Sequence, residues 1–385
     1  MKREKWLDAI KGIACIVVFF SHFYLTFCSE SVLLNRVLSI KPLQILVNGN
    51  YAVCLFLMIS AYVISVPVYT CHRLDRIRQT AFKRYLRLML PVFFASALSF
   101  ILSRTVGYYN LQAADLLNNP WLKEFFTQKL TAADLLHSSL IGVWWQGDNS
   151  FNGPFWMLRT LFLGTFLVII LAVITSGEKT KKAYAGGVLA LMLCVYLEVN
   201  VYDGCLVFGT LLAFLKCRTN LFEPRRRKKG SKYVTVFLLG ASLFLPSFQN
   251  ELTSFFSKYE IFPAYFSDPA FYNGFAGFLL LFSLMSLPGI QDRLGNSRSL
   301  GRISRISFSV YLLHWPVICS FSCWFYVRFG ADATGAFLTL LFLLTAAMVT
   351  AASKIFYELI ERKLCAGITD KLCSLYLQTP PDGSV

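Results

Sequence analysis

Residues 9–28 read AIKGIACIVVFFSHFYLTFC, an apolar run that only Lys11, Ser21, His22 and Thr26 interrupt. About 20 such residues in a helix reach across the hydrocarbon core of a bilayer. The run is too long for the apolar part of a signal peptide, and no convincing small-residue cleavage site follows it. We therefore expect it to form a first membrane-spanning helix.

The composition of the whole chain agrees with a membrane environment. Of its 385 residues, 56% are hydrophobic and only 15% are charged. A soluble domain must cover its surface with polar groups, and this composition excludes that. The expected fold class is all-α, in a polytopic membrane protein.

Further apolar runs of roughly spanning length follow along the chain. They lie near residues 45–69, 85–104, 155–175, 184–198, 202–216, 233–248, 271–288, 305–327 and 335–357. The sequence thus predicts about ten membrane helices, with short interfacial helices in the connection 105–154. We expect residues 1–377 to form a single transmembrane domain and residues 378–385 to form a short cytoplasmic tail.

Basic residues fall unevenly on the two sides that ten crossings define. The side with both chain ends carries 26 Lys and Arg residues, and the opposite side carries 7. Cytoplasmic loops are enriched in Lys and Arg, so we expect both termini in the cytoplasm and the protein in the plasma membrane. The net charge of +16 and the basic run 225–229 could also suggest nucleic acid. A short loop between two spans is better explained as an orientation signal touching anionic lipid, so no nucleic-acid partner is expected.

The eleven cysteines do not form a CxxC pair or a metal-ligand spacing. Most lie in apolar runs, where a thiol behaves as a small hydrophobic group. These are Cys15, Cys54, Cys194, Cys205, Cys319 and Cys323. We expect no metal site.

Lys11 and His22 are ionisable groups at membrane depth, where such groups are expensive to bury. Their spacing in a helix leaves them about 20° apart around the axis and ~16 Å apart along it, so they share a face. Lys11 could instead extend back to the cytoplasmic headgroups. His22 could be a neutral imidazole hydrogen-bonded to another helix. The functional interpretation of His22 is a general base.

A second deep histidine, His314, lies about nine residues, or some ~13 Å, after Arg305. It reaches the same layer as His22 if the two helices are neighbours. Tyr311 lies one turn earlier on a similar face. The other two histidines, His72 and His137, lie among polar neighbours and are expected to be incidental.

Arg84 and Arg87 lie one turn apart near the cytoplasmic start of the run 85–104. Two guanidinium groups at this spacing can hold a phosphate. Ordinary anchoring by cytoplasmic basic residues is the alternative. Glu358 and Glu361 near the end of the last run need no explanation beyond capping and interfacial solvation.

Several segments together resemble the acyltransferase-3 membrane family. Residues 6–14, WLDAIKGIA, with Ser21-His22 after them resemble its first-helix signature, Leu-Asp-x-x-Arg-Gly-x-Ala followed by a histidine. Residues 55–62, LFLMISAY, are similar to its Phe-Phe-x-x-Ser-Gly-Phe stretch, and residues 308–316, FSVYLLHWP, to its Ser-x-Tyr-Leu-x-His segment.

Two more segments and three departures complete this resemblance. Residues 84–91 resemble the basic segment of the family, and residues 356–362, FYELIER, its closing Ile-Glu-Arg-Pro motif. Lys11 stands where the family has an arginine, Leu161 lies near the place of an acidic residue, and Lys363 stands in place of the final proline. Lysine keeps the charge but lacks the bidentate fork of arginine.

The resemblance implies transfer of an acyl group, most often acetyl from acetyl-CoA, to a hydroxyl of a cell-envelope glycan or a related acceptor. Acetyl-CoA would be a co-substrate, with no permanently bound cofactor. His22 would be the general base. The phosphates of the coenzyme would be held by Lys11, Arg84 and Arg87, while His314 and Tyr311 would orient the base or stabilise the oxyanion.

Two other classes of protein remain open on the sequence. In a transporter or exporter the buried histidines would relay protons, and Trp144, Trp145 and Trp156 would line a substrate entrance. Inverted repeats with matching broken helices, which many transporters show, are not visible in the sequence. A purely structural scaffold would leave the deep histidines and the paired arginines unexplained.

Overall fold

We describe the protein from a computed structural model, for residues 4–29, 31–71, 74–176, 200–219, 221–222, 231–259, 264–330 and 333–376. The chain divides into two compact units. Unit 1 comprises Met1–His72 and Gly164–Ser307, and unit 2 comprises Arg73–Leu163 and Phe308–Val385. Two helices, α8 (Trp156–Ser176) and α15 (Arg298–Val317), pass from one unit into the other. The predicted cytoplasmic tail 378–385 lies outside the described residues.

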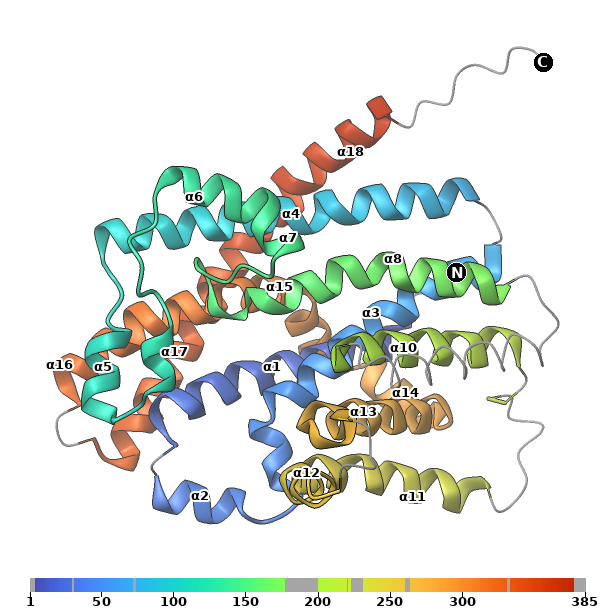
Figure 1. The fold of residues 1–385 in the computed structure, drawn as a ribbon, viewed down its shortest axis with the longest axis horizontal. Coiled ribbons are helices and arrows are strands. Elements are labelled where there is room, and N and C mark those ends of the chain that lie inside the picture. The colour runs from blue at the N-terminus through green and yellow to red at the C-terminus, as the bar shows by residue number, and fades with distance from the viewer. Residues whose placement is uncertain are drawn as a thin grey trace. The chain divides into compact units, whose positions relative to one another are not determined.

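The described residues are helical without any strand, which confirms the all-α prediction (Figure 1). The remaining elements of unit 1 are α1 (Lys5–Phe27), α2 (Val32–Leu38), η1 (Leu43–Val47), α3 (Gly49–Cys71), α10 (Val201–Arg218), α11 (Ser231–Phe244), η6 (Leu245–Phe248), α12 (Gln249–Phe256), η7 (Ala264–Ser267), α13 (Pro269–Met285) and α14 (Pro288–Gly295). Those of unit 2 are α4 (Leu74–Thr105), α5 (Asn110–Leu117), η2 (Trp121–Glu124), α6 (Ala132–His137), η3 (Ser138–Gly142), α7 (Val143–Trp145), η4 (Gly153–Phe155), η8 (Ile318–Ser322), α16 (Cys323–Phe329), α17 (Gly335–Phe356), η9 (Tyr357–Cys365) and α18 (Ala366–Tyr376).

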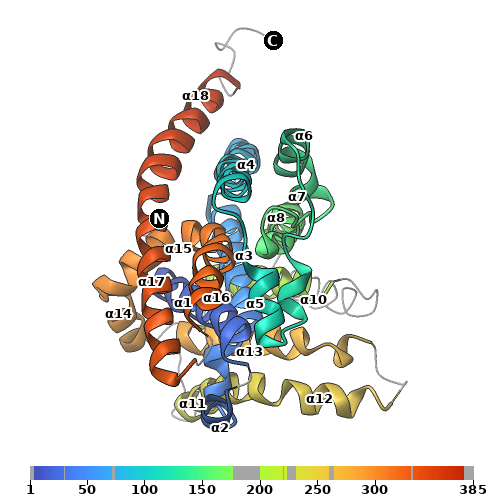
Figure 2. The same ribbon diagram turned by 90° about the vertical axis from the view of Figure 1, so that its left-hand side faces the viewer.

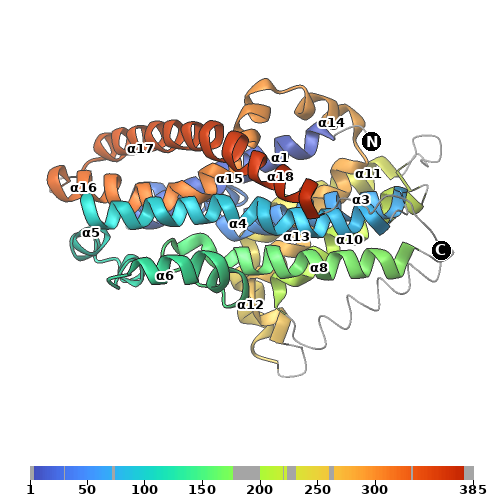
Figure 3. The same cartoon turned by 90° about the horizontal axis from the view of Figure 1, so that it is seen from above.

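Helix α3 is the centre of unit 1, where it packs against α1, α10 and α13. Its side chains at Leu57, Met58 and Ile59 are fully buried. Gly209 of α10 lies so close to α3 that an added Cβ would come within 2.9 Å of the carbonyl carbon of Met58. A glycine at such a contact lets two membrane helices approach closely, because it presents no side chain between them. Figure 3 shows α14 beside α1 in the same unit.

The core of unit 2 is formed by α4, α7, η4, α8, α15 and α17. The aromatic side chains Trp144 and Phe155 are fully buried in it, together with Leu158 and Leu312. The last elements, α17, η9 and α18, follow one another as a single continuous ribbon (Figure 2). The connection 105–154 contains the short helices α5, η2, α6, η3 and α7, as the sequence predicted.

Six described helices are long and apolar enough to cross a membrane, or seven if the bent pair α13–α14 is one span. The six are Lys5–Phe27, Gly49–Thr70, Arg84–Thr105, Gly153–Ser176, Arg298–Phe329 and Gly335–Leu372. The predicted span 184–198 lies outside the described residues. The predicted span 202–216 corresponds to the 18-residue α10, and the span 233–248 corresponds mainly to the 14-residue α11. The span 271–288 corresponds to α13, which meets α14 at a bend of 98°. Six of the ten predicted spans therefore have a helix that is long and apolar enough to cross a membrane, and the count of ten stays a prediction.

Five of the apolar-run cysteines are buried, in agreement with their expected role as small hydrophobic side chains. They are Cys15, Cys54, Cys205, Cys319 and Cys323, all as free thiols. Cys194 lies outside the described residues.

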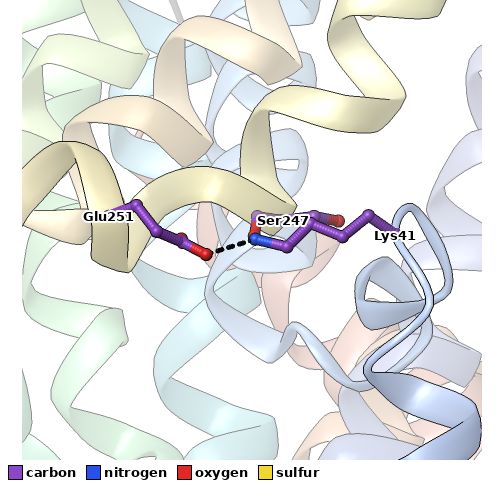
Figure 4. Close-up of polar contacts among 3 residues, drawn as sticks. All are labelled: Lys41, Ser247 and Glu251. Carbon is purple, nitrogen blue, oxygen red and sulfur yellow. Dashed lines mark hydrogen bonds and ion pairs between the residues drawn. The ribbon is translucent and has the colours of Figure 1, made fainter.

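Lys41 links two parts of unit 1 that are far apart in the chain (Figure 4). Its ammonium donates hydrogen bonds to the carbonyl of Ser247 and, at 2.5 Å, to Oε1 of Glu251. It also lies 4.0 Å from the ring centre of Phe248. The segment before η1 is thereby tied to η6 and α12. The hydrogen bond from Lys41 holds the pKa of the Glu251 carboxyl below its ordinary value.

Replacement of Lys41 by methionine should lower stability by about 0.5–1 kcal/mol at neutral pH, since an exposed ion pair and a cation–π contact are each worth little. A carboxyl with a lowered pKa stabilises the fold above its unfolded pKa, and this contribution is lost as pH falls through its folded pKa. The difference from the native protein should therefore shrink on acidification. Thermal unfolding in detergent across pH measures it. Lys258→Met, at an exposed lysine without an ion pair to a described residue, is the control, and a difference independent of pH would contradict the prediction.

Candidate functional site

Helix α1 carries the two site residues that the sequence predicts in unit 1, Lys11 and His22, and both side chains are half-buried. The imidazole Nδ1 of His22 lies 2.9 Å from the carbonyl oxygen of Val18, one turn earlier. A carbonyl oxygen can only accept, so Nδ1 must donate its hydrogen. In the neutral ring the other nitrogen, Nε2, then carries the lone pair. His22 is therefore held in the tautomer that can take up a proton at Nε2.

The start of α3 packs against Ser21, the residue before His22 in α1. Gly49 is the first residue of α3, and an added Cβ there would lie 2.9 Å from Oγ of Ser21, the neighbour of His22. The N-terminus of α3 thus packs directly against this part of α1.

His314 lies in α15 within unit 2, and its side chain is fully buried. Its Nδ1 is 2.9 Å from the carbonyl oxygen of Val310 and 3.0 Å from that of Tyr311. Both acceptors are carbonyl groups, so this ring also donates from Nδ1 and keeps its lone pair on Nε2. The two deep histidines thus have the same local arrangement on their own helices.

Asn152 fixes the segment of α15 that carries His314. Pro316 has no N–H, so it cannot donate the usual helical hydrogen bond to the carbonyl of Leu312. A buried carbonyl without a partner is unfavourable. The side chain of Asn152, itself only 1% exposed, donates to this oxygen over 2.6 Å. Asn152 therefore satisfies the acceptor that Pro316 leaves open.

The loop before Asn152 is held by its own carboxylate, Asp148. Oδ1 of Asp148 accepts hydrogen bonds from the backbone N–H of Ser150 at 2.9 Å and from its hydroxyl at 2.5 Å. Partial burial alone would raise the pKa of Asp148, but the nearby hydroxyl of Ser138 and the hydrogen bonds from Ser150 outweigh it and lower that pKa. The ionised carboxylate thus keeps the loop in the shape that presents Asn152.

Tyr311 makes the second tie between α15 and this segment. Its hydroxyl donates a hydrogen bond to the carbonyl of Pro154. A phenol has one hydrogen to donate, and here it is directed to the backbone. The ring centre of Tyr311 is 6.3 Å from that of His314. The arrangement favours a positioning role for Tyr311 over direct stabilisation of an oxyanion.

Aromatic side chains enclose the next residue of α15, Trp315. Its ring centre lies 4.7 Å from that of Phe125 and 5.1 Å from that of Trp121. Gly153 fits against this group only because it lacks a side chain. An added Cβ would lie 2.5 Å from Cε1 of Phe125 and 2.9 Å from Nε1 of Trp315. Figure 2 shows α5 and α16 of this unit, which also pack against each other.

Glu361 has a role that the sequence did not reveal. It lies in η9, and the hydroxyl of Ser309 in α15 donates a hydrogen bond to its carboxylate. Glu358, in contrast, forms an exposed ion pair with Arg362 at 2.7 Å. The resemblance of residues 356–362 to a closing motif was the signal that could have pointed to Glu361. Its partner could not be identified from sequence spacing.

Arg84 and Arg87 lie one turn apart on α4 in unit 2, with Arg84 half-buried and Arg87 exposed. Tyr85 between them donates a hydrogen bond of 3.0 Å to the carbonyl of Leu140. Its ring also contacts Trp144, with ring centres 6.0 Å apart. These contacts hold the helix turn on which the two arginines lie. The one-turn spacing of the two arginines on α4 is the one that the sequence predicted.

The predicted site residues thus fall into two groups. Lys11 and His22 belong to unit 1, whereas Arg84, Arg87, Tyr311 and His314 belong to unit 2. The structure explains how each group is held on its own helices. The common layer for His22 and His314 stays a prediction.

A family model described as an acyltransferase domain, that of the acyltransferase-3 family, matches residues 4–364. This range includes every predicted site residue. No curated protein matches the chain. No solved structure matches it either.

Proposed function

The chain belongs to the acyltransferase-3 family of membrane proteins, and from this premise we propose that it is an O-acyltransferase. The donor is acetyl-CoA or another acyl-CoA. The acceptor is a hydroxyl group of a cell-envelope glycan or a related molecule. The donor is a co-substrate that is consumed in each cycle.

The tautomer of His22 is the observation that carries this proposal. Its Nδ1–H donates to Val18, so Nε2 is the nitrogen that accepts a proton. A hydroxyl is a poor nucleophile at neutral pH, and a base that removes its proton during attack accelerates the reaction by ~10²–10⁴-fold. The imidazole of His22 is the general base in the proposed mechanism.

His22 alone can both remove and return the proton that the reaction requires. The acceptor oxygen attacks the thioester carbonyl, and its proton moves to Nε2 of His22 as the C–O bond forms. The tetrahedral intermediate then collapses, the C–S bond breaks, and the proton passes from His22 to the leaving sulfur. The products are the ester and the free thiol of the coenzyme. His314 and Tyr311 position the segment of α15 on which they lie.

In this proposal Lys11, Arg84 and Arg87 each contribute to binding phosphate groups of the donor. Charge-assisted hydrogen bonds from such groups to phosphate are stronger than neutral ones. The split of 26 against 7 basic residues supports a cytoplasmic location for both termini in the plasma membrane. That side of the membrane is where acyl-CoA is available.

An assay with two readouts tests the proposed function. The purified full chain in nanodiscs is given labelled acetyl-CoA and an envelope glycan fraction, and both thiol release and label in the glycan are measured. An acyltransferase releases thiol in proportion to acceptor labelling. A transporter releases none above the background without protein. Thiol release without any labelled acceptor across hydroxyl compounds would overturn the transfer reaction.

Lys11 should affect donor binding more than the chemical step. Lys11→Gln removes the charge and should raise the KM for acyl-CoA about tenfold, since a hydrogen bond to a charged group is worth about 1.5–3 kcal/mol. Lys11→Arg keeps the charge and adds a group that can donate two parallel hydrogen bonds, so it should keep the KM at or below the native value. Steady-state kinetics in acyl-CoA separate KM from kcat. If both variants have the native KM, Lys11 does not contact the donor.

A further inference from the structure

A cavity of about 980 Å³ lies in unit 1 where the start of α1 meets α14 and the start of α15. It is lined by Lys5, Asp8, Leu294, Gly295, Asn296, Ser297, Arg298, Gly301, Arg302 and Arg305. We call these residues the basic pocket. None of them is among the residues to which the proposed mechanism assigns a role.

The charge of the basic pocket is strongly positive. Lys5, Arg298, Arg302 and Arg305 line it together with one acidic residue, Asp8. The three arginines follow a spacing of four and three residues along α15, so they lie within about 60° of one another on one face. All four basic side chains are exposed. The cavity therefore presents a cluster of four cations to the solvent.

The position of these arginines is unusual for a helix. A helix N-terminus carries partial positive charge, so basic residues are unfavourable there and anions are favourable. Ser297 is the N-terminal capping residue, since its hydroxyl accepts from the backbone N–H of Leu300 at 3.4 Å. Arg298 and Arg302 nevertheless lie in the first turns of α15. An anion bound in the cavity would relieve this repulsion.

Orientation in the membrane alone does not explain the arrangement. To orient a protein in the membrane, cytoplasmic basic residues only need to lie near the membrane surface. Arg293 of α14 is an exposed basic residue that does not line the cavity. The four basic residues of the basic pocket instead line one cavity. Its walls are also closely packed, because a Cβ at Gly12 would lie 2.9 Å from the carbonyl oxygen of Leu300, and one at Gly295 would lie 3.2 Å from Cβ of Lys5.

We propose that the basic pocket binds the phosphate groups of an anion about the size of a nucleotide. Its volume falls within the range of ~300–1,000 Å³ that is typical of small-molecule sites. Arginine suits phosphate because its planar group donates two parallel hydrogen bonds. The nucleotide part of acyl-CoA and the headgroup of an anionic lipid share this chemistry. The choice of the donor as the source rests on the proposed function.

The test compares three variants of the full chain in nanodiscs with the native protein. Arg298→Gln/Arg302→Gln removes two cations of the basic pocket, and Arg293→Gln removes a nearby one outside it. The probes are coenzyme A and adenosine 3′,5′-bisphosphate. Their binding to the protein in nanodiscs of neutral lipid is measured by calorimetry. We expect the double variant to bind both about tenfold more weakly or worse, because each arginine donates charge-assisted hydrogen bonds. The Arg293 variant should bind as the native protein does, and Arg298→Lys/Arg302→Lys should recover part of the affinity.

A second arm distinguishes the two phosphate sources. Thermal stability is measured in neutral nanodiscs and in nanodiscs that contain phosphatidylglycerol. If the double variant loses only the stabilisation by anionic lipid, the pocket binds phosphate and its ligand is a lipid headgroup. If neither coenzyme A binding nor lipid stabilisation changes, the pocket does not bind phosphate.

The outcomes also separate this inference from the proposed function. If the native protein transfers acyl groups but the double variant keeps full affinity for all probes, the basic pocket does not bind phosphate. The proposed acyltransferase function would still stand. Native protein that binds coenzyme A through the pocket but never releases thiol supports the pocket and rejects the acyltransferase.

Discussion

Replacement of His22 by glutamine is expected to lower the rate of acyl transfer by about 10²–10⁴-fold, the contribution typical of a general base. Glutamine retains hydrogen-bonding atoms and comparable size but cannot take up a proton near neutral pH. The affinity for coenzyme A should stay near the native value, because the base acts on the acceptor hydroxyl. Thiol release under saturating donor measures the effect on kcat.

His137→Gln is the matched control for this prediction. It makes the same change at an exposed histidine of α6, so it should leave the rate unchanged. Thermal unfolding of both variants shows whether the fold is kept. A folded His22→Gln protein that acylates its acceptor at the native rate would remove His22 from the mechanism.

Asn152→Leu is expected to destabilise the protein by about 1–3 kcal/mol, the penalty for a buried polar group that loses its partner. The group left without a partner is the carbonyl of Leu312, which accepts from Asn152 at 2.6 Å. The effect should be smaller when Pro316 is replaced by alanine. Residue 316 then has an N–H that can donate to the same carbonyl in the ordinary helical pattern.

A double-mutant cycle measures this coupling. The stabilities of the native protein, Asn152→Leu, Pro316→Ala and the double variant are compared by unfolding in detergent, and we expect an interaction energy of about 1 kcal/mol or more between the two sites. Asn149→Leu in the same loop is the control, because that side chain is exposed and its nearest acceptor is 3.5 Å away. Purely additive effects would mean that Asn152 does not compensate for Pro316.

The sequence by itself determined that the protein is helical and lies in a membrane. Apolar runs of spanning length predict helices directly, because a backbone in lipid must satisfy its hydrogen bonds within one segment. Six of the ten predicted spans have a described helix that is long and apolar enough to cross a membrane. The bend between α13 and α14 was missed, since the continuous hydropathy of residues 271–288 does not reveal where a helix turns at Pro288.

Local spacing also predicted part of the candidate site. Lys11 with His22, and Tyr311 with His314, lie on single helices, where the pitch alone sets their separation. The sequence predicted where these residues lie on their helices, but it did not predict their hydrogen-bond partners. The assignment of the histidine tautomers required the carbonyl oxygens of Val18 and Val310 in the structure.

Only the tertiary structure decided which distant residues act together. The hydrogen bond from Asn152 to Leu312 joins residues 160 positions apart, and that from Ser309 to Glu361 joins residues 52 apart. The basic pocket likewise combines the start of α1 with α14 and α15. Such contacts depend on how helices pack, and packing depends on close approaches such as that of Gly12 to Leu300. Hydropathy and spacing describe each helix alone, so they predict its position in the membrane but not the neighbour that completes its site.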